Sequence, residues 1–328
     1  MISTYPVNHS LIRSEAILTR LLPEYDLGGF TRCRLLYSGV NDTYLAVTGG
    51  GEKYVMRIYR TPWRSWSNIS YELEILNHLH VKGVAVARPL PVQNGDWILP
   101  VPAPEGLRHA VLFTFARGKE ISYKTEPAQM AYSYGQAVGK LHAAVQDFYS
   151  PHARQPLDLE FLLDVPLQLA KPYLAHRSQD WEEMKRIVEK LHHQLEGLPL
   201  SHLTRGFVHG DLQGYHANVD EEGTLTFYDF DCCGPGFRAY DLAVIRWCSR
   251  LEDSETTRWE PCLRGYQEVF PLSEVDIAAI PSFVGCRYMW HIGLHTANAD
   301  DWGHGWLNDE YFDNALKNLR KVEEDYKI

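Results

Sequence analysis

The hydrophobic pattern of this chain changes once along its length, and this change constrains the fold more than any other feature. Residues 30–116 hold short apolar runs separated by turns rich in glycine and proline, which is typical of β-strands. One longer stretch among them, SNISYELEILNHLHVKGV, has helical spacing. Beyond residue 116 the pattern becomes mainly helical. We therefore predict an α+β fold with a small antiparallel-sheet lobe that has one helix, residues 1–115, and a larger, mainly helical lobe, residues 116–328.

The composition excludes several classes of protein. With 328 residues, 45% of them hydrophobic, the chain can bury a substantial core. Its formal net charge of −10 opposes broad binding to nucleic acid or to an anionic membrane. The six cysteines form no CxxC pair, as expected in a reducing compartment. The N-terminus lacks the pattern of a secretory signal, and no apolar stretch is long enough to span a membrane. We expect a cytoplasmic protein without nucleic-acid or membrane partners.

The second lobe returns briefly to strand-like runs, and these end on carboxylates. The runs GFVHGD and TLTFYDFD are separated by an acidic turn, so a short hairpin would bring Asp211 and Asp229 together at one sheet edge. Two like charges this close require a divalent cation or a raised pKa. Asp231 would return to the same strand face, where it would contact a metal or a substrate amine, or pair with a backbone amide in a structural role.

Two motifs in this region resemble those of the aminoglycoside phosphotransferase and choline kinase family, which shares the protein-kinase architecture. They are HGDL at residues 209–212 and YDFDCCGPGFRAYDLA at residues 228–243. The resemblance implies that Asp211 accepts the proton of the substrate hydroxyl, and that Asp229 chelates magnesium bridging the phosphates of ATP. It also implies that His209 orients the loop backbone. Homoserine kinases and stress-response kinase A are relatives with this pattern.

The first lobe resembles the nucleotide-binding part of the same family. Ser38 and Gly39, in YSGVNDTYLAV, occupy the place of the hairpin that covers the phosphates. Arg57 stands where the family usually has the lysine that holds the α and β phosphates, and arginine can also bind phosphate. Its expected carboxylate partner is Glu72 on the predicted helix.

Three further positions complete the resemblance. Thr114 and Ala116, in LFTFARG, would present backbone groups to the adenine edge. With the metal-chelating role of Asp229, the resemblance implies ATP and Mg²⁺ as cofactors. Asp241, in YDLA, resembles the aspartate that braces the catalytic loop from behind.

The expected metal site departs from the family pattern. The family usually has asparagine five residues after the catalytic aspartate, but here that position is His216, and Asn218 follows two residues later. Either residue is a candidate second metal ligand beside Asp229. An imidazole is a softer ligand than an amide oxygen, so Mn²⁺ would be better tolerated if His216 takes this role.

The last third of the chain is rich in aromatic and acidic residues. Asp300, Asp301 and Trp302 would select a cationic amino-alcohol or aminosugar by charge and cation–π contact. A zinc site is the alternative, because His291 and His295 are four residues apart with Asp300 after them.

These features predict an ATP-dependent phosphotransferase that acts on a hydroxyl of a small molecule, such as an amino-alcohol, a hydroxy-amino acid or an aminoglycoside-like compound. Three alternatives remain open: a protein Ser/Thr kinase of the stress-response type, a metal-dependent hydrolase, and a pseudokinase that only binds nucleotide. The hydrolase would use His209, Asp211, His216 and Asp229. The pseudokinase is motivated by Arg57 and by His216 at the asparagine position. The oligomeric state has no signal in the sequence.

Overall fold

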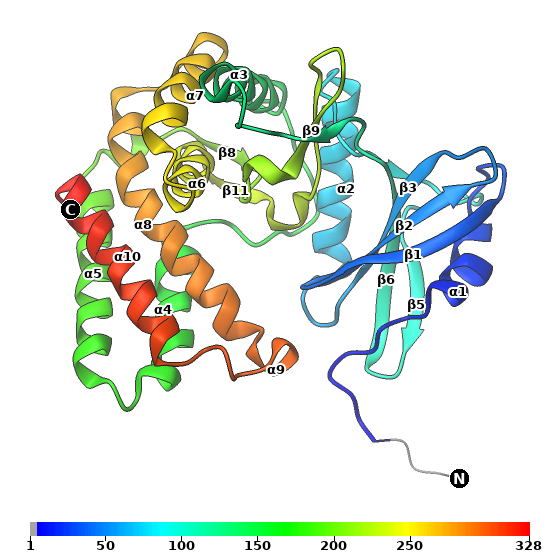
Figure 1. The fold of residues 1–328 in the computed structure, drawn as a ribbon, viewed down its shortest axis with the longest axis horizontal. Helices are drawn as coiled ribbons and strands as arrows, with labels where there is room; N and C mark the ends of the chain where they lie inside the picture. The colour runs from blue at the N-terminus through cyan, green and yellow to red at the C-terminus, as the bar shows by residue number, and fades with distance from the viewer. Residues whose placement is uncertain (1–4) are drawn as a thin grey trace. The chain divides into compact units, whose positions relative to one another are not determined.

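The computed structural model describes residues 5–328 and divides into two compact units. Unit 1 is formed by Met1–Arg117, described from residue 5, together with the short segments Tyr149–Ala153 and Thr226–Tyr228. Unit 2 is formed by Gly118–Phe148, Arg154–Leu225 and Asp229–Ile328. The predicted α+β class with an antiparallel sheet is confirmed, because unit 1 holds one such sheet and unit 2 is mainly helical (Figure 1).

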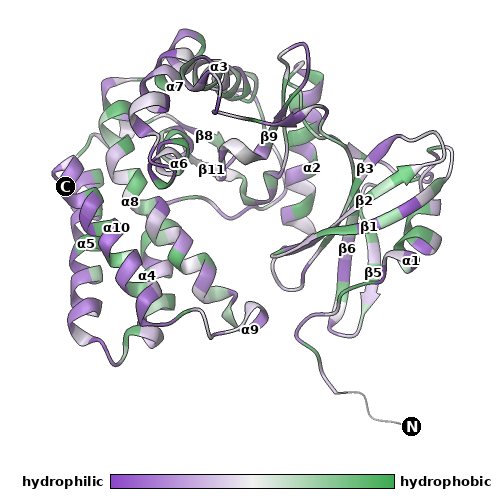
Figure 2. Cartoon of the chain, in the orientation of Figure 1, coloured by the Kyte–Doolittle hydropathy of each residue, from purple (hydrophilic) through white to green (hydrophobic). Residues whose placement is uncertain are grey.

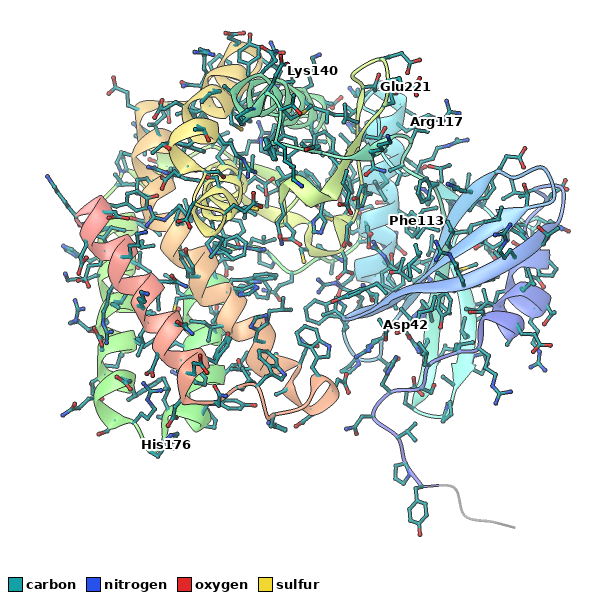
Figure 3. The ribbon with its side chains drawn as sticks, in the orientation of Figure 1. Asp42, Phe113, Arg117, Lys140, His176 and Glu221 are labelled. Carbon is teal, nitrogen blue, oxygen red and sulfur yellow. The ribbon has the colours of Figure 1, made fainter. Side chains whose placement is uncertain are left out.

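The sheet of unit 1 has six antiparallel strands in the order β1-β2-β3-β6-β4, with β5 also paired to β6. These strands are β1 (Phe30–Ser38), β2 (Asn41–Thr48), β3 (Lys53–Tyr59), β4 (Pro89–Leu90), β5 (Leu99–Ala103) and β6 (Gly106–Thr114). The first three strands form a meander because Gly39 and the glycines of residues 49–51 make the two turns between them. Figure 3 labels Asp42 in β2 and Phe113 in β6, two positions that bear on the site.

One face of this sheet is covered by the N-terminal helical segment. This segment consists of α1 (Ser14–Ala16), a π-helical turn (Ile17–Leu21) and a 3-10 turn (Leu22–Glu24). Ile17 and Leu22 are completely buried in one core cluster with the inward side chains of β2, β3 and β6. The burial of these apolar side chains is the main force that holds the segment on the sheet.

The predicted helix of the first lobe is α2 (Trp66–Val81). Ser65 caps its N-terminus: the Asn68 backbone N–H donates to the Ser65 hydroxyl, and the Asn68 side chain accepts from the Ser65 N–H. The helix ends before Gly83, whose φ of 80° is the left-handed conformation that favours glycine after a helix.

Unit 2 is built around α8 (Glu274–Ala297), which contacts α4, α5, α6 and α10. The other helices are α3 (Pro127–Ala144), α4 (Val165–Ala170), α5 (Ser178–Glu196), α6 (Arg238–Leu251), α7 (Glu255–Val269), α9 (Ala299–Trp302) and α10 (Asp309–Tyr326). Figure 2 shows hydrophilic residues alternating with hydrophobic ones along α5 and α10, as expected of helices with one buried face. Among residues 5–328, the helices include none that is both long and apolar enough to cross a membrane.

The strand pairing in unit 2 differs from the predicted hairpin. β8 (Arg205–Val208) pairs with β11 (Gly234–Phe237), not with the run that contains Asp229. That run is extended only in β10 (Leu225–Phe227), because Asp229 adopts a left-handed backbone and residues 230–232 form a 3-10 turn. A further short strand, β9 (Ala217–Val219), pairs with β7 (Lys119–Glu120). The prediction of a continuous strand through Asp229 and Asp231 was therefore wrong.

Candidate active site

The loop that follows β8 carries His209, Gly210 and Asp211. Gly210 has a φ of 78°, and a Cβ added to it would lie 2.4 Å from the Cys232 carbonyl oxygen. The position therefore excludes any larger residue on both conformational and steric grounds. His209 is fully buried, its ring centroid lies 4.4 Å from that of Phe230, and burial lowers its pKa. A neutral, packed His209 shapes the backbone that presents Asp211.

Asp241 in the first turn of α6 holds this loop from the inside. Its two carboxylate oxygens accept hydrogen bonds of 2.7 Å from the backbone N–H groups of His209 and Gly210. His142 of α3 lies 3.0 Å from the same carboxylate and 2.7 Å from the Tyr266 hydroxyl. Because these groups are completely or almost completely buried, their hydrogen bonds replace the water that they lose on folding. This network fixes the position of the loop.

Asp211 is held in its ionised form by a cation from α8. The Arg287 guanidinium donates to Asp211 Oδ1, and it also donates to the Gly210 carbonyl over 3.2 Å. The Gln213 amide donates a further hydrogen bond of 2.7 Å to the same carboxylate oxygen. Burial alone would raise the pKa of Asp211, but the charge of Arg287, with the hydrogen bond from Gln213, outweighs it and holds the pKa well below its usual range.

Arg287 is the site residue that the sequence reasoning missed. Its side chain is only 1% exposed, and its guanidinium carbon lies 4.7 Å from the Trp247 ring centroid and 4.3 Å from that of Trp290. A buried arginine is costly unless it is paired, and here the pair is Asp211. The available signal was an isolated charge within FVGCRYMW, an otherwise apolar run on a long helix.

His216 lies between the two aspartates. Its Nδ1 is 2.7 Å from the Asp211 carbonyl oxygen and 3.4 Å from Asp211 Oδ2, and its Nε2 is 3.8 Å from Asp229 Oδ2. Asn218, the other candidate ligand, lies in β9 opposite Glu120 and is 8% exposed. The structure thus brings Asp211, Asp229 and His216 together, although by a loop and not by the predicted hairpin.

Asp229 has the unusual backbone of this site. Its φ of 62° is rare for a residue other than glycine, and strain of this kind concentrates at functional positions. The Asp229 side chain is 41% exposed, whereas Asp231 is only 3% exposed. Arg154 supports the turn by donating to the carbonyl oxygens of Asp231 and Cys233. Because Asp231 lies in the 3-10 turn, its predicted place on a shared strand face was wrong.

Asp229 has few protein ligand groups around it in the described part of the chain, so the site suits a cation that takes its other ligands from substrate phosphates. Across residues 5–328, no group of three or more His, Cys, Asp or Glu side chains could hold a metal ion. Mg²⁺ keeps several waters and is usually bound through one or two carboxylates plus phosphates. A partly exposed carboxylate beside one further donor therefore fits magnesium better than zinc.

Arg57 and Glu72 form the expected ion pair in unit 1. Arg57 Nη1 lies 2.8 Å from Glu72 Oε1, and the Tyr59 hydroxyl donates to Glu72 Oε2 over 3.0 Å. Glu72 is only 1% exposed, so it is not a solvated surface residue. The Arg57 guanidinium carbon also lies 5.3 Å from the Phe113 ring centroid. The strand β3 and the helix α2 are thereby joined by a buried charge pair.

Ser38 ends β1, and Gly39 begins the turn to β2. The Ser38 hydroxyl donates to Asp42 Oδ1 over 2.7 Å and accepts from Arg60 over 3.2 Å, while the Gly39 N–H donates to the Asn41 carbonyl. Asp42 is completely buried and receives a hydrogen bond of 2.7 Å from Arg108 (Figure 3 labels Asp42). The Ser38 hydroxyl therefore serves to hold the turn.

Thr114 and Ala116 lie at the end of β6. The Thr114 N–H donates to the Arg88 carbonyl over 2.9 Å, and its hydroxyl accepts from the Arg88 N–H over 3.0 Å. The Thr114 amide is therefore already engaged within unit 1. Ala116 follows the strand and is 7% exposed.

The residues proposed for acceptor binding lie around the C-terminal end of α8 and α9. The Asp300 side chain is 86% exposed and pairs with His304 over 2.9 Å, and Asp301 is also exposed. The Trp302 ring centroid lies 6.1 Å from that of His295, and its indole nitrogen is buried without a hydrogen-bond partner among the described residues.

The zinc alternative does not fit this arrangement. The His291 and His295 ring centroids are 4.0 Å apart, but His295 Nδ1 lies 2.9 Å from the Tyr311 hydroxyl and Asp300 turns to His304. Burial lowers the pKa of His291 to about 3 and that of His295 to about 4, so both are neutral at physiological pH. The alternative of a zinc site is therefore ruled out for these described residues, and the histidines contribute to an uncharged aromatic wall.

Comparison with known proteins gives a consistent family assignment. The model described as the phosphotransferase enzyme family matches residues 33–267. An uncharacterized protein of Deinococcus radiodurans is 34% identical over 98% of this chain and 93% of its own length. A homoserine kinase of Rhodospirillum rubrum is 28% identical over 82% of this chain and 81% of its own length. An amicoumacin kinase of Bacillus subtilis is 23% identical over 87% of this chain and 85% of its own length.

Solved structures share the fold. A microcompartment-associated aminopropanol kinase superposes with a TM-score of 0.74 at 24% identity, covering 94% of this chain and 95% of that one. An amicoumacin kinase in complex with AMP-PNP, Ca²⁺ and Ami gives a TM-score of 0.74 at 20% identity, covering 93% of this chain and 95% of that one.

Proposed function

We propose that this chain, which belongs to the phosphotransferase enzyme family, transfers the γ-phosphate of ATP to a hydroxyl of a small molecule. Family members among its relatives are kinases of hydroxyl-bearing small molecules, and the chain is a kinase of this type. The observation that carries the proposal is Asp211, an ionised carboxylate that Arg287 and a braced loop hold beside Asp229.

Asp211 would orient the acceptor hydroxyl and take its proton. The hydroxyl oxygen forms a bond to the γ-phosphorus as the bond from that phosphorus to the leaving oxygen of ADP breaks, and the proton passes to a carboxylate oxygen. Because Arg287 keeps the pKa of Asp211 low, this carboxylate is a weak base. The proton then transfers late, and positioning contributes more than proton abstraction.

Asp229 and His216 would hold a divalent cation together with the phosphates. The cation neutralises charge on the transferring group. His216 is the preferred second ligand in this proposal because its Nε2 faces the Asp229 carboxylate. Asn218 remains the alternative to His216 as the second ligand of the cation.

The choice between these ligands predicts a metal preference. We expect the His216→Asn variant to lower the ratio of the Mn²⁺-supported to the Mg²⁺-supported kcat/KM by about tenfold, because an amide oxygen is a harder ligand than imidazole. Steady-state assays with each metal measure the ratio. Asn218→Ala is the matched control and should leave the ratio unchanged; a shift in Asn218→Ala alone would assign the ligand to Asn218.

The acceptor is an amino-alcohol or a hydroxy-amino acid in this proposal. Aminopropanol kinase and homoserine kinase are both among the similar proteins, and both names denote acceptors with an amine and a hydroxyl. An assay of ADP release with a panel of such compounds tests the function, and mass spectrometry identifies the phosphorylated product. The proposal is excluded if no hydroxylated small molecule stimulates ADP release from a folded, nucleotide-binding protein.

Trp302 is the preferred specificity residue on the acceptor side. Its buried indole N–H has no partner among the described residues, so an acceptor oxygen would satisfy it. We expect Trp302→Ala to raise the acceptor KM about tenfold and to leave the KM for ATP unchanged. Asp300→Ala is the control from the same helix, because the Asp300 carboxylate faces solvent. Equal effects on both substrates in Trp302→Ala would contradict this role.

A further inference from the structure

A cavity of 410 Å³ lies in unit 1 beside α2, away from the residues assigned above. Its wall combines residues of α2 with residues of the segment before β5 and of the segment Tyr149–Ala153. The residues that matter for its chemistry are Trp66, Glu74, Asn77, Asp96, Trp97 and His152. We call this space the α2 cavity. Its volume is within the range of small-ligand pockets.

The α2 cavity and the Arg57 pair use opposite faces of one helix. Successive residues of an α-helix are rotated by about 100°, so Glu74 points roughly 200° away from Glu72. Glu72 binds Arg57, whereas Glu74 lines the cavity and lies 3.5 Å from His152 Nε2. A ligand in the cavity would therefore contact the helix that positions Arg57.

Glu74 has an unmet hydrogen-bonding need. Its Oε1 faces His152, but its Oε2 is inaccessible to solvent and has no hydrogen-bond partner among the described residues. A desolvated carboxylate oxygen without a donor is costly, and native proteins seldom retain one. The Glu74 side chain as a whole is 40% exposed and lines the cavity, so its carboxylate can take a donor from a ligand there.

Two tryptophans of the cavity are unusually exposed. Trp66, the first residue of α2, is 53% exposed, and Trp97 is 36% exposed. The Trp66 ring is held in place by an edge contact to His152, with ring centroids 5.2 Å apart. Tryptophan faces attract organic cations more strongly than other side-chain rings do.

The charge of the wall agrees with a cationic ligand. Glu74 and Asp96 are its carboxylates, and His152 is its one residue able to carry a positive charge among those that line the cavity. Asp96 is held by hydrogen bonds of 2.9 Å with Asn94, so its loop is ordered. Carboxylates beside tryptophan faces form the kind of site that binds an ammonium group.

We propose that the α2 cavity binds a small aliphatic amine in its protonated form. The ammonium group donates to the Glu74 carboxylate, and the alkyl chain lies against Trp66 and Trp97. Occupation stabilises α2 and thereby the Glu72–Arg57 pair, which raises the affinity for nucleotide. This regulatory consequence rests on the proposed function, whereas amine binding does not.

Titration calorimetry with putrescine tests the binding. Putrescine has no hydroxyl, so it cannot be phosphorylated as an acceptor. We expect Glu74→Gln and Trp66→Ala each to weaken its affinity at least about tenfold. Glu182→Gln, which removes an exposed carboxylate of α5, is the matched control and should bind like the wild type. If an α2 variant fails to fold, Asp96→Asn replaces it as the test variant, because Asp96 lines the cavity from a loop, and it should also weaken putrescine binding.

Two results overturn the site: unchanged affinity in folded Glu74→Gln, or loss of putrescine binding in Trp302→Ala, which would place the amine at the acceptor region. Coupling is measured as the Kd for ATP with and without putrescine. Adding putrescine should lower the Kd for ATP in the wild type and leave it unchanged in Glu74→Gln. A constant Kd in the wild type overturns the regulatory role, and failure to find an acceptor would affect the proposed function alone.

Discussion

Replacing Asp211 by asparagine is expected to lower kcat by about 10²–10⁴-fold, the usual contribution of a positioned proton acceptor. The amide keeps the shape of the side chain but loses the charge that orients the hydroxyl and receives its proton. It also leaves Arg287, which is 1% exposed, without its anionic partner. Removing one member of a buried pair costs about 3 kcal/mol or more, so the midpoint of thermal unfolding should fall as well.

A double variant separates catalysis from stability. Arg287→Met in the Asp211→Asn background removes the uncompensated charge, so it should restore much of the lost stability without restoring kcat. Unfolding curves and steady-state rates on the four proteins of this cycle provide the measurements. A kcat within about tenfold of the wild type in folded Asp211→Asn would contradict the assignment of Asp211 and favour a binding role.

Replacing Arg287 by methionine is expected to move the acid limb of the pH profile toward neutrality. In the wild type, the Arg287 charge keeps the pKa of Asp211 below its usual value, so Asp211 is ionised throughout the neutral range. Without the guanidinium, the largest of the effects that lower this pKa is lost while burial still raises it, so the pKa of Asp211 rises relative to the wild type. The variant should therefore lose kcat/KM as the pH falls, at a pH where the wild type still retains its activity.

The same pair predicts the pH dependence of stability. A carboxylate whose pKa is depressed on folding stabilises the protein above its unfolded pKa of about 4, and this contribution is lost as the pH falls toward the folded pKa. Wild type should thus lose stability below about pH 4, and Arg287→Met should not show this loss. Arg287→Lys keeps the charge and should restore the wild-type acid limb. An identical limb in wild type and Arg287→Met would refute the electrostatic role of Arg287.

Contiguous motifs were enough to predict the loop that holds Asp211 and the carboxylate partner of Arg57. HGD and the later YDLA are contiguous motifs, and the hydrogen bonds from the loop to Asp241 join them as the resemblance implied. Glu72 was identified by its place in the family resemblance, and it is 1% exposed whereas the Glu74 side chain is 40% exposed. In both cases the information lies within one element or one motif.

Contacts between residues far apart in the sequence could not be predicted from local motifs. The strand expected through Asp229 ended earlier because the residue adopts a left-handed backbone, which depends on packing of the turn by Arg154. Arg287 is 76 residues away from Asp211, so neither spacing nor periodicity relates the two side chains. The same holds for the α2 cavity, whose wall comes from three separate segments.

By itself, the sequence determined the α+β class, the family and the motifs that contain Asp211, Asp229 and Asp241, because periodicity and contiguous motifs are local properties. The tertiary structure alone decided that Arg287 neutralises Asp211, that His216 faces Asp229, and that Glu74 Oε2 is buried without a donor among residues 5–328. The physical reason is that pairing and desolvation depend on distances between side chains from different elements, and packing sets those distances.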